Sequence, residues 1–450
     1  MRHAMGEPDR QDRAPPGARL PSPRRISVSL VAAGLAACAS VASAQGLSLD
    51  DYFSAALNRS EVVASQAELI RQAEEHYKQA TSALLPTVNG VASYTWQEPL
   101  SIATPSTSTT LLSYQPLAKL TATQPLFRGF REFAALRQTQ ALVNAQNDDY
   151  LNARVQLFKD VVQSFYNVLS IEQDLRNYDA EIKQDLDRET ELDARVRIGR
   201  SRVSEVLTVQ SAISALRAQV ESLQGQLRVA RETFAFLSGL DAATPLNDTE
   251  ALPNQLEPVD TYLARLALRP DVKASQKRLA AARENVTVVK GANLPSVDLN
   301  GNYYLDRPGI LKDVNWDVQI ALTVPIYAGG LLQSKTREAQ SQSTQAELTA
   351  SQVSRQAEQE IRSLYQSVVF DRAQLAALEK ANDAAQANYE AQRRDYRLGL
   401  VTNLDLLQAL TAAQESQRTL DRARYAAKLD YVKLQLSAVQ RAGLLTDATP

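Results

Sequence analysis

The stretch Pro125-Leu126-Phe127-Arg128-Gly129 returns about 200 positions later as Pro325-Ile326-Tyr327-Ala328-Gly329. Each copy opens a long run without proline, over residues 126–244 and again over residues 326–449. Proline inside a helix removes a backbone hydrogen bond and clashes with the preceding turn, so these runs permit helices much longer than those of most globular proteins. The duplication therefore predicts one architecture built from two matching halves.

Each proline-free run has the pattern of two helices joined by a glycine turn. The first contains Arg197-Ile198-Gly199 and the second Arg397-Leu398-Gly399, and glycine after a basic last turn is a helix stop. With a rise of about 1.5 Å per residue, the first arm of each hairpin would be on the order of 100 Å long. Apolar residues at alternating three- and four-residue spacing predict coiled-coil packing of the arms. In the first hairpin they are Val209, Ile213, Leu216, Val220, Leu223, Leu227, Ala230, Phe234 and Leu237, and in the second, more loosely, Leu406, Leu410, Leu420, Leu429, Val432 and Leu436.

Strand patterns precede both hairpins. Each half begins with two helical segments, residues 49–57 and 61–85 or residues 259–268 and 271–294, and each pair ends in Leu-Pro. Alternation of polar and apolar residues then predicts strands at about 87–97 and 112–124, and at about 296–305 and 314–324. Residues 101–110, rich in Ser and Thr, and the Pro308-Gly309 segment are predicted to be the connecting loops.

The two faces of the predicted strands differ in chemistry. Asp298, Asn300, Asn302, Asp317 and Gln319 share one face, which we expect to line a water-filled lumen. The other face is apolar, and aromatic residues stand near both ends of the strands, as in the aromatic girdles of transmembrane barrels. A soluble sheet with one face on a core has the same alternation. Since four strands cannot close, a membrane barrel would have to be shared between subunits.

The first 44 residues have the features of a secretory leader. Arg24-Arg25 precede the apolar residues 26–41, and Ala42-Ser43-Ala44 resembles a cleavage site. Leu35-Ala36-Ala37-Cys38 also resembles a lipoprotein signal, and Arg24-Arg25 resembles a twin-arginine signal. Plain cleavage is favoured because only a few residues separate Cys38 from the first helical segment, which would leave little tether.

The composition argues against several classes of function. Cys38 is the only cysteine, and His76 is the only histidine after the leader. The chain therefore has too few Cys and His residues to favour a disulfide, a zinc site or a catalytic triad. The formal net charge is −2, and removal of the arginine-rich leader makes it more negative, which argues against nucleic-acid binding. With no glycine-rich phosphate loop, we expect no enzyme and no cofactor. No apolar run after the leader reaches the roughly 20 residues of a transmembrane helix.

Taken in order, these motifs resemble the TolC family of bacterial outer-membrane channels. The resemblance covers residues 47–442 and is carried by the duplicated helix, Leu-Pro, strand, loop, strand and proline-aromatic order, and by Arg397-Leu398-Gly399-Leu400 before Asp405-Leu406-Leu407. It implies a mainly α protein with a transmembrane β part. Three copies would form a long α-helical coiled-coil barrel in the periplasm and a 12-stranded β-barrel in the lipid of the outer membrane.

The resemblance also implies partners and sites. A periplasmic adaptor protein would contact the hairpin tips at Gly199, Arg200, Gly399 and Leu400 and connect the duct to an inner-membrane transporter. The entrance would be narrowed by gate residues at Glu205, Tyr396, Asp405 and Gln408, with Tyr396 able to link to Glu205. Val401 stands where the family can have a gate arginine, and Gln408 where it can have a second aspartate. The glycines also serve the turns by themselves, and Asp405 can form a capping box with Thr402.

The expected division of the chain follows the repeat. Residues 1–44 form the signal peptide, 45–240 the first repeat with its tip near 199, 241–258 an equatorial linker, 259–442 the second repeat with its tip near 399, and 443–450 a tail. The function expected is a passive exit duct of a tripartite efflux pump or a type I secretion system. The alternative is an exported coiled-coil protein of a filament or surface layer, which has no need of amphipathic strand pairs.

Overall fold

The computed structural model describes residues 46–441, apart from 99–100, 105–106 and 111–113. The expected leader with Cys38 and the tail 443–450 lie outside the described residues. All the helices and strands lie in one compact unit that begins at Leu47. None of the helices in this part of the chain has the length and apolar character needed to cross a membrane.

Two very long helices dominate the fold, α3 with 67 residues and α7 with 68. Helices and strands follow one another in the order expected from the repeat. In chain order they are α1 (Leu49–Arg59), α2 (Glu61–Ser82), β1 (Thr87–Trp96), β2 (Ser101–Thr104), β3 (Thr107–Thr110), β4 (Tyr114–Phe127), α3 (Arg131–Arg197), α4 (Val203–Ser238), α5 (Val259–Leu263), the 3-10 turn η1 (Leu266–Leu268), α6 (Pro270–Gly291), β5 (Ser296–Asp306), the 3-10 turn η2 (Gly309–Leu311), β6 (Trp316–Thr323), α7 (Leu331–Leu398) and α8 (Asn403–Ser437).

The four long strands form one antiparallel sheet in the order β1-β4-β5-β6. The register pairs Gly90 with Leu120, Thr123 with Asn300, and Asn300 in turn with Gln319. Strands β1 and β6 are the edges, so over the described residues each has one side with no strand partner. The expectation of a plain loop at 101–110 was wrong, because β2 and β3 pair there as a short antiparallel hairpin. Thr is β-branched and favours extended backbone, which the loop interpretation of that Ser/Thr-rich stretch left out.

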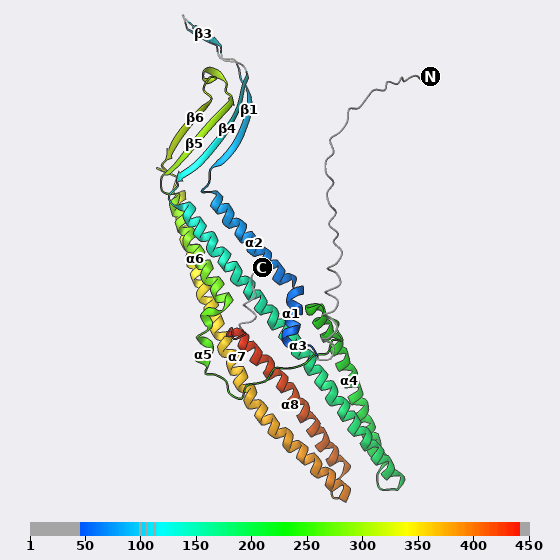
Figure 1. The fold of residues 1–450 in the computed structure, drawn as a ribbon. Helices are drawn as coiled ribbons and strands as arrows, with labels where there is room; N and C mark the ends of the chain where they lie inside the picture. The colour runs from blue at the N-terminus through cyan, green and yellow to red at the C-terminus, as the bar shows by residue number, and fades with distance from the viewer. Residues whose placement is uncertain (1–45, 99–100, 105–106, 111–113, 442–450) are drawn as a thin grey trace, which may run out of the picture. The chain divides into compact units, whose positions relative to one another are not determined.

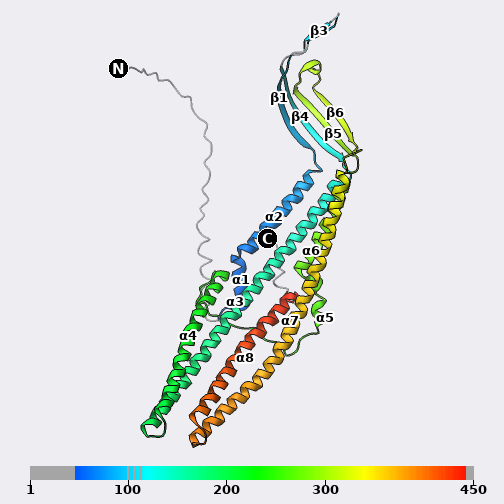
Figure 2. The same ribbon diagram turned by 180° about the vertical axis from the view of Figure 1, so that it is seen from behind.

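The helices continue the order of the strands (Figures 1 and 2). Next to the sheet, α2 packs on α3, α3 on α6 and α6 on α7. Farther from the sheet, α4 replaces α2 and α8 replaces α6, while α3 and α7 continue through both levels. The helices therefore form a layer four helices wide, with α2 or α4 at one edge and α7 at the other.

The glycine turns that follow Pro125 and Pro325 have different surroundings in the two halves. Gly129, with φ +69°, lies against the end of α6, where an added Cβ would meet the carbonyl oxygen of Gly291. This backbone contact fixes α3 against α6 just below the sheet. Its counterparts Gly329 and Gly330 also have positive φ, but nothing lies within 4 Å of a Cβ built there. The same turn is thus packed in the middle of the layer and open at the α7 edge.

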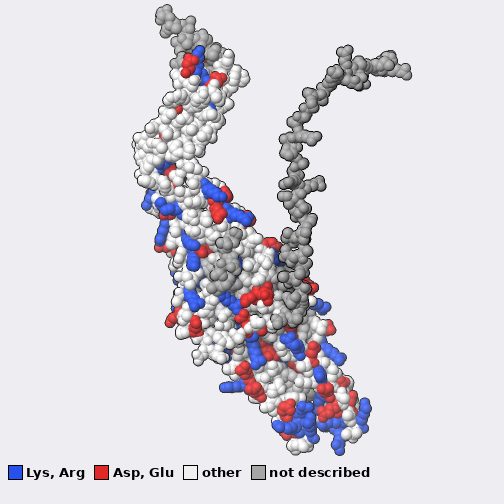
Figure 3. Space-filling model, viewed as in Figure 1, with Lys and Arg blue, Asp and Glu red and all other residues white. Residues whose placement is uncertain are grey.

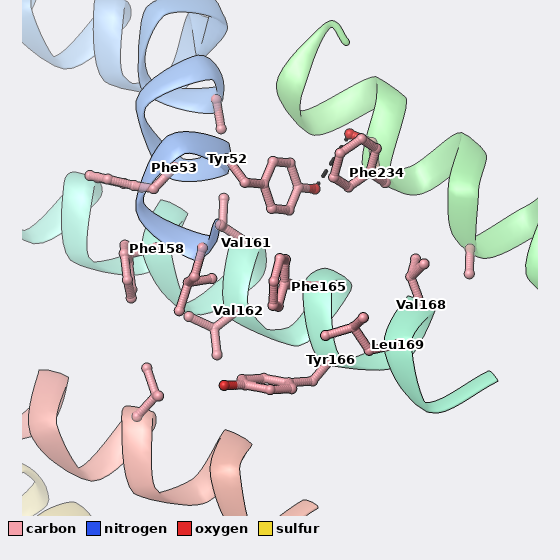
Figure 4. Close-up of a cluster of buried hydrophobic side chains, with 14 of the residues drawn as sticks. Tyr52, Phe53, Phe158, Val161, Val162, Phe165, Tyr166, Val168, Leu169 and Phe234 are labelled. Atoms are coloured by element: carbon pink, nitrogen blue, oxygen red, sulfur yellow. Dashed lines mark hydrogen bonds between the residues drawn. The ribbon is translucent and has the colours of Figure 1, made fainter. Parts of the chain in front are cut away.

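The main hydrophobic core lies where α1, α3, α4 and α8 meet (Figure 4). Tyr52 of α1 packs against Phe234 of α4 with the rings tilted and their centroids 4.3 Å apart, and Phe53 meets Phe158 of α3 edge-on at 4.8 Å. The Tyr52 hydroxyl donates to the carbonyl oxygen of Phe234 at 3.4 Å and forms a second hydrogen bond with the Ser164 hydroxyl at 3.3 Å. This cluster holds the layer together at the level where α4 and α8 take over from α2 and α6.

Candidate functional site: the sheet faces and the hairpin tips

The five residues expected on a lumen lie on one face of the sheet. Asn302 donates to Asp317 at 2.7 Å, and these two residues are register partners on β5 and β6. Asn300 accepts from Thr123 of β4 at 3.0 Å and is opposite Gln319. The remaining member, Asp298, pairs with Arg128 at 2.8 Å where the strands meet α3. Polar side chains thus form hydrogen bonds with one another across three strands, on a face that no hydrophobic core covers.

The opposite face of the sheet is apolar and exposed. On β6 the exposed fraction is 61 % for Val318, 68 % for Ile320 and 65 % for Leu322. Trp96 and Trp316, at the ends of β1 and β6, are also exposed. On the side seen in the surface view, most of the sheet surface is uncharged, and acidic and basic side chains are seen mainly at its outer end (Figure 3). An exposed apolar face of this size marks contact with lipid or with another protein.

The two hairpin tips end in the same type of turn. The amide of Arg200 donates to the carbonyl of Arg195, and that of Gly199 to Val196. At the second tip the amide of Leu400 donates to Asp395 and that of Gly399 to Tyr396. These paired bonds with a left-handed glycine are the Schellman motif. Nothing lies within 4 Å of a Cβ built on Gly199 or Gly399, so both expected docking glycines face open space in the single chain.

The four expected gate residues lie near the tips in different settings. Glu205, in the first turn of α4, accepts from Ser201 at 2.7 Å. Asp405 forms the capping box, with hydrogen bonds from the hydroxyl and amide of Thr402 at 2.6 and 2.9 Å. These bonds lower the pKa of Asp405. Gln408 is exposed on α8. Tyr396 is buried, and no hydrogen bond joins it to Glu205 in the described part of the chain.

Tyr396 instead packs against two arginines of α3. The guanidinium of Arg188 lies 4.0 Å from its ring centroid and that of Arg195 4.5 Å away. Arg188 also donates to the side-chain oxygen of Asn403, at 3.2 Å from Nε and 2.5 Å from Nη2. The buried residues Arg188, Tyr396 and Asn403, which we name the tip cluster, join the ends of α3 and α7 to the start of α8.

Arg188 belongs to a polar seam between α3 and α8 that the apolar pattern did not indicate. Asp174 accepts from Arg422 at 2.8 Å, Glu181 pairs with Arg418, and Asn177 donates to Asp421 at 3.0 Å. Toward the tips, polar pairs such as these connect the two hairpins, and each hairpin also encloses an apolar cluster between its own arms. Buried polar residues at heptad-like spacing on α3 were the available signal. They are Asp174, Glu181, Asp185 and Arg188.

Asp185 lies on the same stripe of α3 and is almost fully buried. Burial raises the pKa of Asp185 to about 6, because the charged carboxylate loses its hydration. His76, by contrast, is exposed on α2, with Nδ1 3.4 Å from the side-chain oxygen of Gln79. Over the described residues, no group of three or more His, Cys, Asp or Glu side chains is placed to hold a metal ion.

Comparison with known proteins identifies the family. The sequence model of the family described as outer membrane efflux protein matches residues 52–240 and 263–438. These residues make up most of the chain and include both halves of the repeat. The chain belongs to the outer membrane efflux protein family. It is therefore a channel protein of the outer membrane that serves export, as the TolC resemblance implied, and its fold combines the helical tunnel and strand sheet of that family.

The individual relatives are distant in sequence, but each match covers most of both chains. The outer membrane efflux protein BepC of Brucella suis is 24% identical, over 76% of this chain and 74% of its own length. The outer membrane protein TolC of Escherichia coli is 23% identical, over 94% of this chain and 87% of its own. Among solved structures, CusC superposes with a TM-score of 0.76 at 18% identity, covering 87% of this chain and 91% of its own.

Proposed function

We propose that three copies of this chain close into one tube that acts as the passive exit duct of a tripartite efflux pump or a type I secretion system. The observation that carries the proposal is that, in the described part of the chain, each edge strand is paired on one side only and no long helix lies beyond α2, α4 or α7, although α5 and η1 pack on the middle of α7. Strand β1 with α2 and α4 forms one edge, and β6 with α7 forms the other. An edge of one kind can meet the edge of the other kind on the next copy, which generates a ring.

Exposed apolar side chains on both edges support this closure. Phe236 on α4 is 73 % exposed and Val62 on α2 is 68 % exposed, while Phe370 on α7 is 65 % exposed. In lipid, the unpaired backbone groups of β1 and β6 would each cost several kcal/mol. Pairing β6 of one copy with β1 of the next removes both open edges, and three copies supply twelve strands.

The proposed tube places the polar sheet face inside and the apolar face against lipid. Solutes would then pass a lumen lined by hydrogen-bonded Asn, Asp and Thr side chains, with no catalytic step. The hairpin tips, at the end of the helices away from the sheet, are the proposed contacts of a periplasmic adaptor through Gly199, Arg200, Gly399 and Leu400. That adaptor would connect the duct to an inner-membrane transporter.

We propose that the entrance is controlled close to these tips. Glu205 and Asp405 lie on the first turns of α4 and α8, and Gln408 lies on the next turn of α8. They are close to the ends of the hairpins, where a tilt of a whole hairpin displaces side chains farthest. Tyr396 would act through the tip cluster by holding α7 against α3. Separation of the second hairpin from the first would widen the entrance. The side chains of the polar seam can form hydrogen bonds with water when the hairpins separate.

Engineered cysteines test the closure, because the expected mature chain has none of its own. Ser93→Cys on β1 with Gln319→Cys on β6 should form disulfides between copies and give a trimer on denaturing gels. Since the register between copies is open, Asn89 and Thr95 replace Ser93 in companion pairs. Thr121→Cys with Gln319→Cys is the control, because β4 is paired on both sides.

Two results would reject the trimer. One is the absence of cross-linked species for every edge pair, and the other is a detergent-extracted particle whose protein mass by light scattering is that of one chain. The same purified sample tests the proposed removal of residues 1–44, because cleavage at Ala44 and lipidation at Cys38 give different masses.

A further inference from the structure

Helix α4 contains a glycine in its interior, Gly225, for which its own surroundings give no reason. The backbone there has no positive φ, and over the described residues nothing lies within 4 Å of a Cβ built on it. Glycine inside a helix is less stable than alanine because it loses more backbone freedom on folding. The missing side chain therefore leaves a gap on the surface of α4 that the described residues do not fill.

The internal repeat indicates which helix can cover this gap. Residues of the two halves correspond at a distance of 200 positions, as Gly199 does to Gly399, so α7 corresponds to α3 and α8 to α4. Within the chain, α3 packs on α8. When β6 of one copy pairs with β1 of the next, α7 of the first copy lies beside α4 of the second. The α7–α4 pair between copies thus repeats the α3–α8 pair within the chain.

The contacts of α3 with α8 predict the positions that meet between copies. Tyr166 packs against Tyr425 with ring centroids 6.4 Å apart, and farther toward the tips Glu181 pairs with Arg418. Most of the corresponding residues of α7 and α4 are small, which permits a closer approach of the two helices. They are Gln366 and Gly225 for the tyrosine pair, Ala381 and Ala218 for the ion pair, and Ala384 and Ser214 for Gln184 and Gln414, which are 3.2 Å apart.

An exposed phenylalanine on α7 fits the gap on α4. Phe370 is one turn beyond Gln366 on the same helix face, and it is 65 % exposed. The corresponding residue of α3 is Ser170. Side-chain sizes are therefore exchanged between the two seams: within the chain a small Ser170 accompanies the large Tyr425, whereas between copies a large Phe370 accompanies Gly225.

Two more apolar residues of α4 are exposed although their counterparts on α8 are packed. Val229, one turn from Gly225, is 69 % exposed, and Phe236 is 73 % exposed. Their counterparts Leu429 and Leu436 both pack in the main core with residues of α3. The edge of α4 thus has the apolar residues of a helix contact without the second helix.

We propose that Phe370 of one copy packs over Gly225 and against Val229 of the next copy, as a knob in a hole. This inference rests on the proposed function, since it requires copies to lie side by side. It adds the residues of the contact and its register. A second copy of this chain is the partner, and α7 and α4 meet through small and apolar residues in place of the ion pairs of the polar seam.

Filling the gap tests the contact, because the two possible settings of Gly225 predict opposite effects. Leucine favours a helix more than glycine does, so at a position that faces water Gly225→Leu should not harm the protein. Under Phe370 the added side chain overfills the contact, and the trimer in detergent should dissociate at least about tenfold faster. Phe370→Ala in the same chain makes room and should restore a rate close to that of the wild type.

The matched control is Gln226→Leu, at the next position of α4. Its counterpart Ala426 is exposed although α8 has a helix on both sides, so position 226 stays in water when α4 is covered. A Gly225→Leu trimer that dissociates no faster than the Gln226→Leu trimer would overturn the proposal. A failure of Phe370→Ala to rescue Gly225→Leu would do the same.

Cysteine pairs test the register. Ala218→Cys with Ala381→Cys, at the positions that correspond to the Glu181 and Arg418 pair, should form disulfides between copies and give a trimer on denaturing gels. A disulfide requires Cα atoms within about 7 Å of each other, so it also reports the close approach. Ala218→Cys with Ala373→Cys is displaced by about two turns and should give none. Equal yields from the two pairs would contradict the register.

The cysteine pairs on β1 and β6 are measured in parallel, so the two levels of the argument fail differently. A trimer that forms through the strands but gives no disulfide between positions 218 and 381 overturns the packing inference alone. A chain that forms no trimer by either route overturns the proposed function, and the packing inference with it.

Discussion

Removal of the Arg188 side chain should free the second hairpin tip from the first. The guanidinium is 8 % exposed and donates two hydrogen bonds to Asn403, so Arg188→Ala leaves the buried Asn403 oxygen without a partner. Hydrogen bonds to a charged donor contribute about 1.5–3 kcal/mol, and the contact with the Tyr396 ring adds roughly 0.5–2 kcal/mol. We expect the free energy of local opening at the tip to fall by about 3 kcal/mol.

Hydrogen exchange measures this opening directly. A change of about 3 kcal/mol corresponds to roughly 100-fold faster exchange, because each 1.4 kcal/mol is about tenfold. The faster exchange should be confined to peptides near Tyr396 and Asn403. The core around Phe165 should exchange at the wild-type rate, since it is far along α3 from the tips. If the tips narrow the entrance, the same variant in a planar bilayer should show a larger single-channel conductance.

Two variants make the argument specific. Arg195→Ala also removes a guanidinium from the Tyr396 ring, but Arg195 has no bond to Asn403, so its effect should stay near 1 kcal/mol or below. Arg188→Lys keeps the charge but loses the planar fork, and should lie between Arg188→Ala and the wild type. Exchange at the tip that is unchanged in Arg188→Ala, or changed equally in Arg195→Ala, would refute the role given to the tip cluster.

Three further predictions concern other parts of the chain. Ile320→Arg, on the exposed apolar face, should destabilise the sheet in a bilayer by about 2–4 kcal/mol, whereas Ala321→Arg on the polar face should be tolerated; equal urea midpoints for the two would reverse the assignment of the faces. Phe234→Ala empties a fully buried site and should lower the free energy of unfolding by about 3–5 kcal/mol, and a loss below about 1 kcal/mol would mean that the core collapses around the gap. The raised pKa of Asp185, about 6, means that the folded state holds its proton after the unfolded chain has released it, so stability should decline as the pH rises from about 4 to about 6. Asp185→Asn should remove that decline and gain about 1 kcal/mol at neutral pH, after allowance for solvent screening, and the same pH dependence in both proteins would exclude Asp185 as its source.

The order of the helices and strands could be predicted from the sequence because it depends on local chemistry. Proline-free runs permit long helices, and Gly199 and Gly399 end them through a left-handed turn that other residues rarely adopt. Alternation in β5 and β6 assigned Asn302 and Asp317 to one face, and the structure pairs them there. Backbone preference and side-chain period act over a few residues, so they can be read without knowing the fold.

The contacts between the two hairpins could not be predicted from the sequence in this way. The family resemblance made Tyr396 a residue able to link to Glu205, which stays a prediction; its contacts with Arg188 and Arg195, more than 200 residues earlier in sequence, were not predicted. Which arginine reaches a given ring depends on the relative rotation and height of two helices. A shift of one turn along helices of this length would select different partners without any change in local pattern.

By itself, the sequence determined the duplicated order of elements, the places where helices end and the two unlike faces of the sheet. Only the tertiary structure decided that α3 and α8 meet through a polar seam, that Arg188, Tyr396 and Asn403 form one buried cluster, and that β1 and β6 remain as open edges. The physical reason is the separation along the chain over which each interaction acts. Propensity, capping and amphipathic period are set by neighbours in the chain, whereas pairing across helices is set by how the hydrophobic core at Tyr52, Phe165 and Phe234 fixes their register.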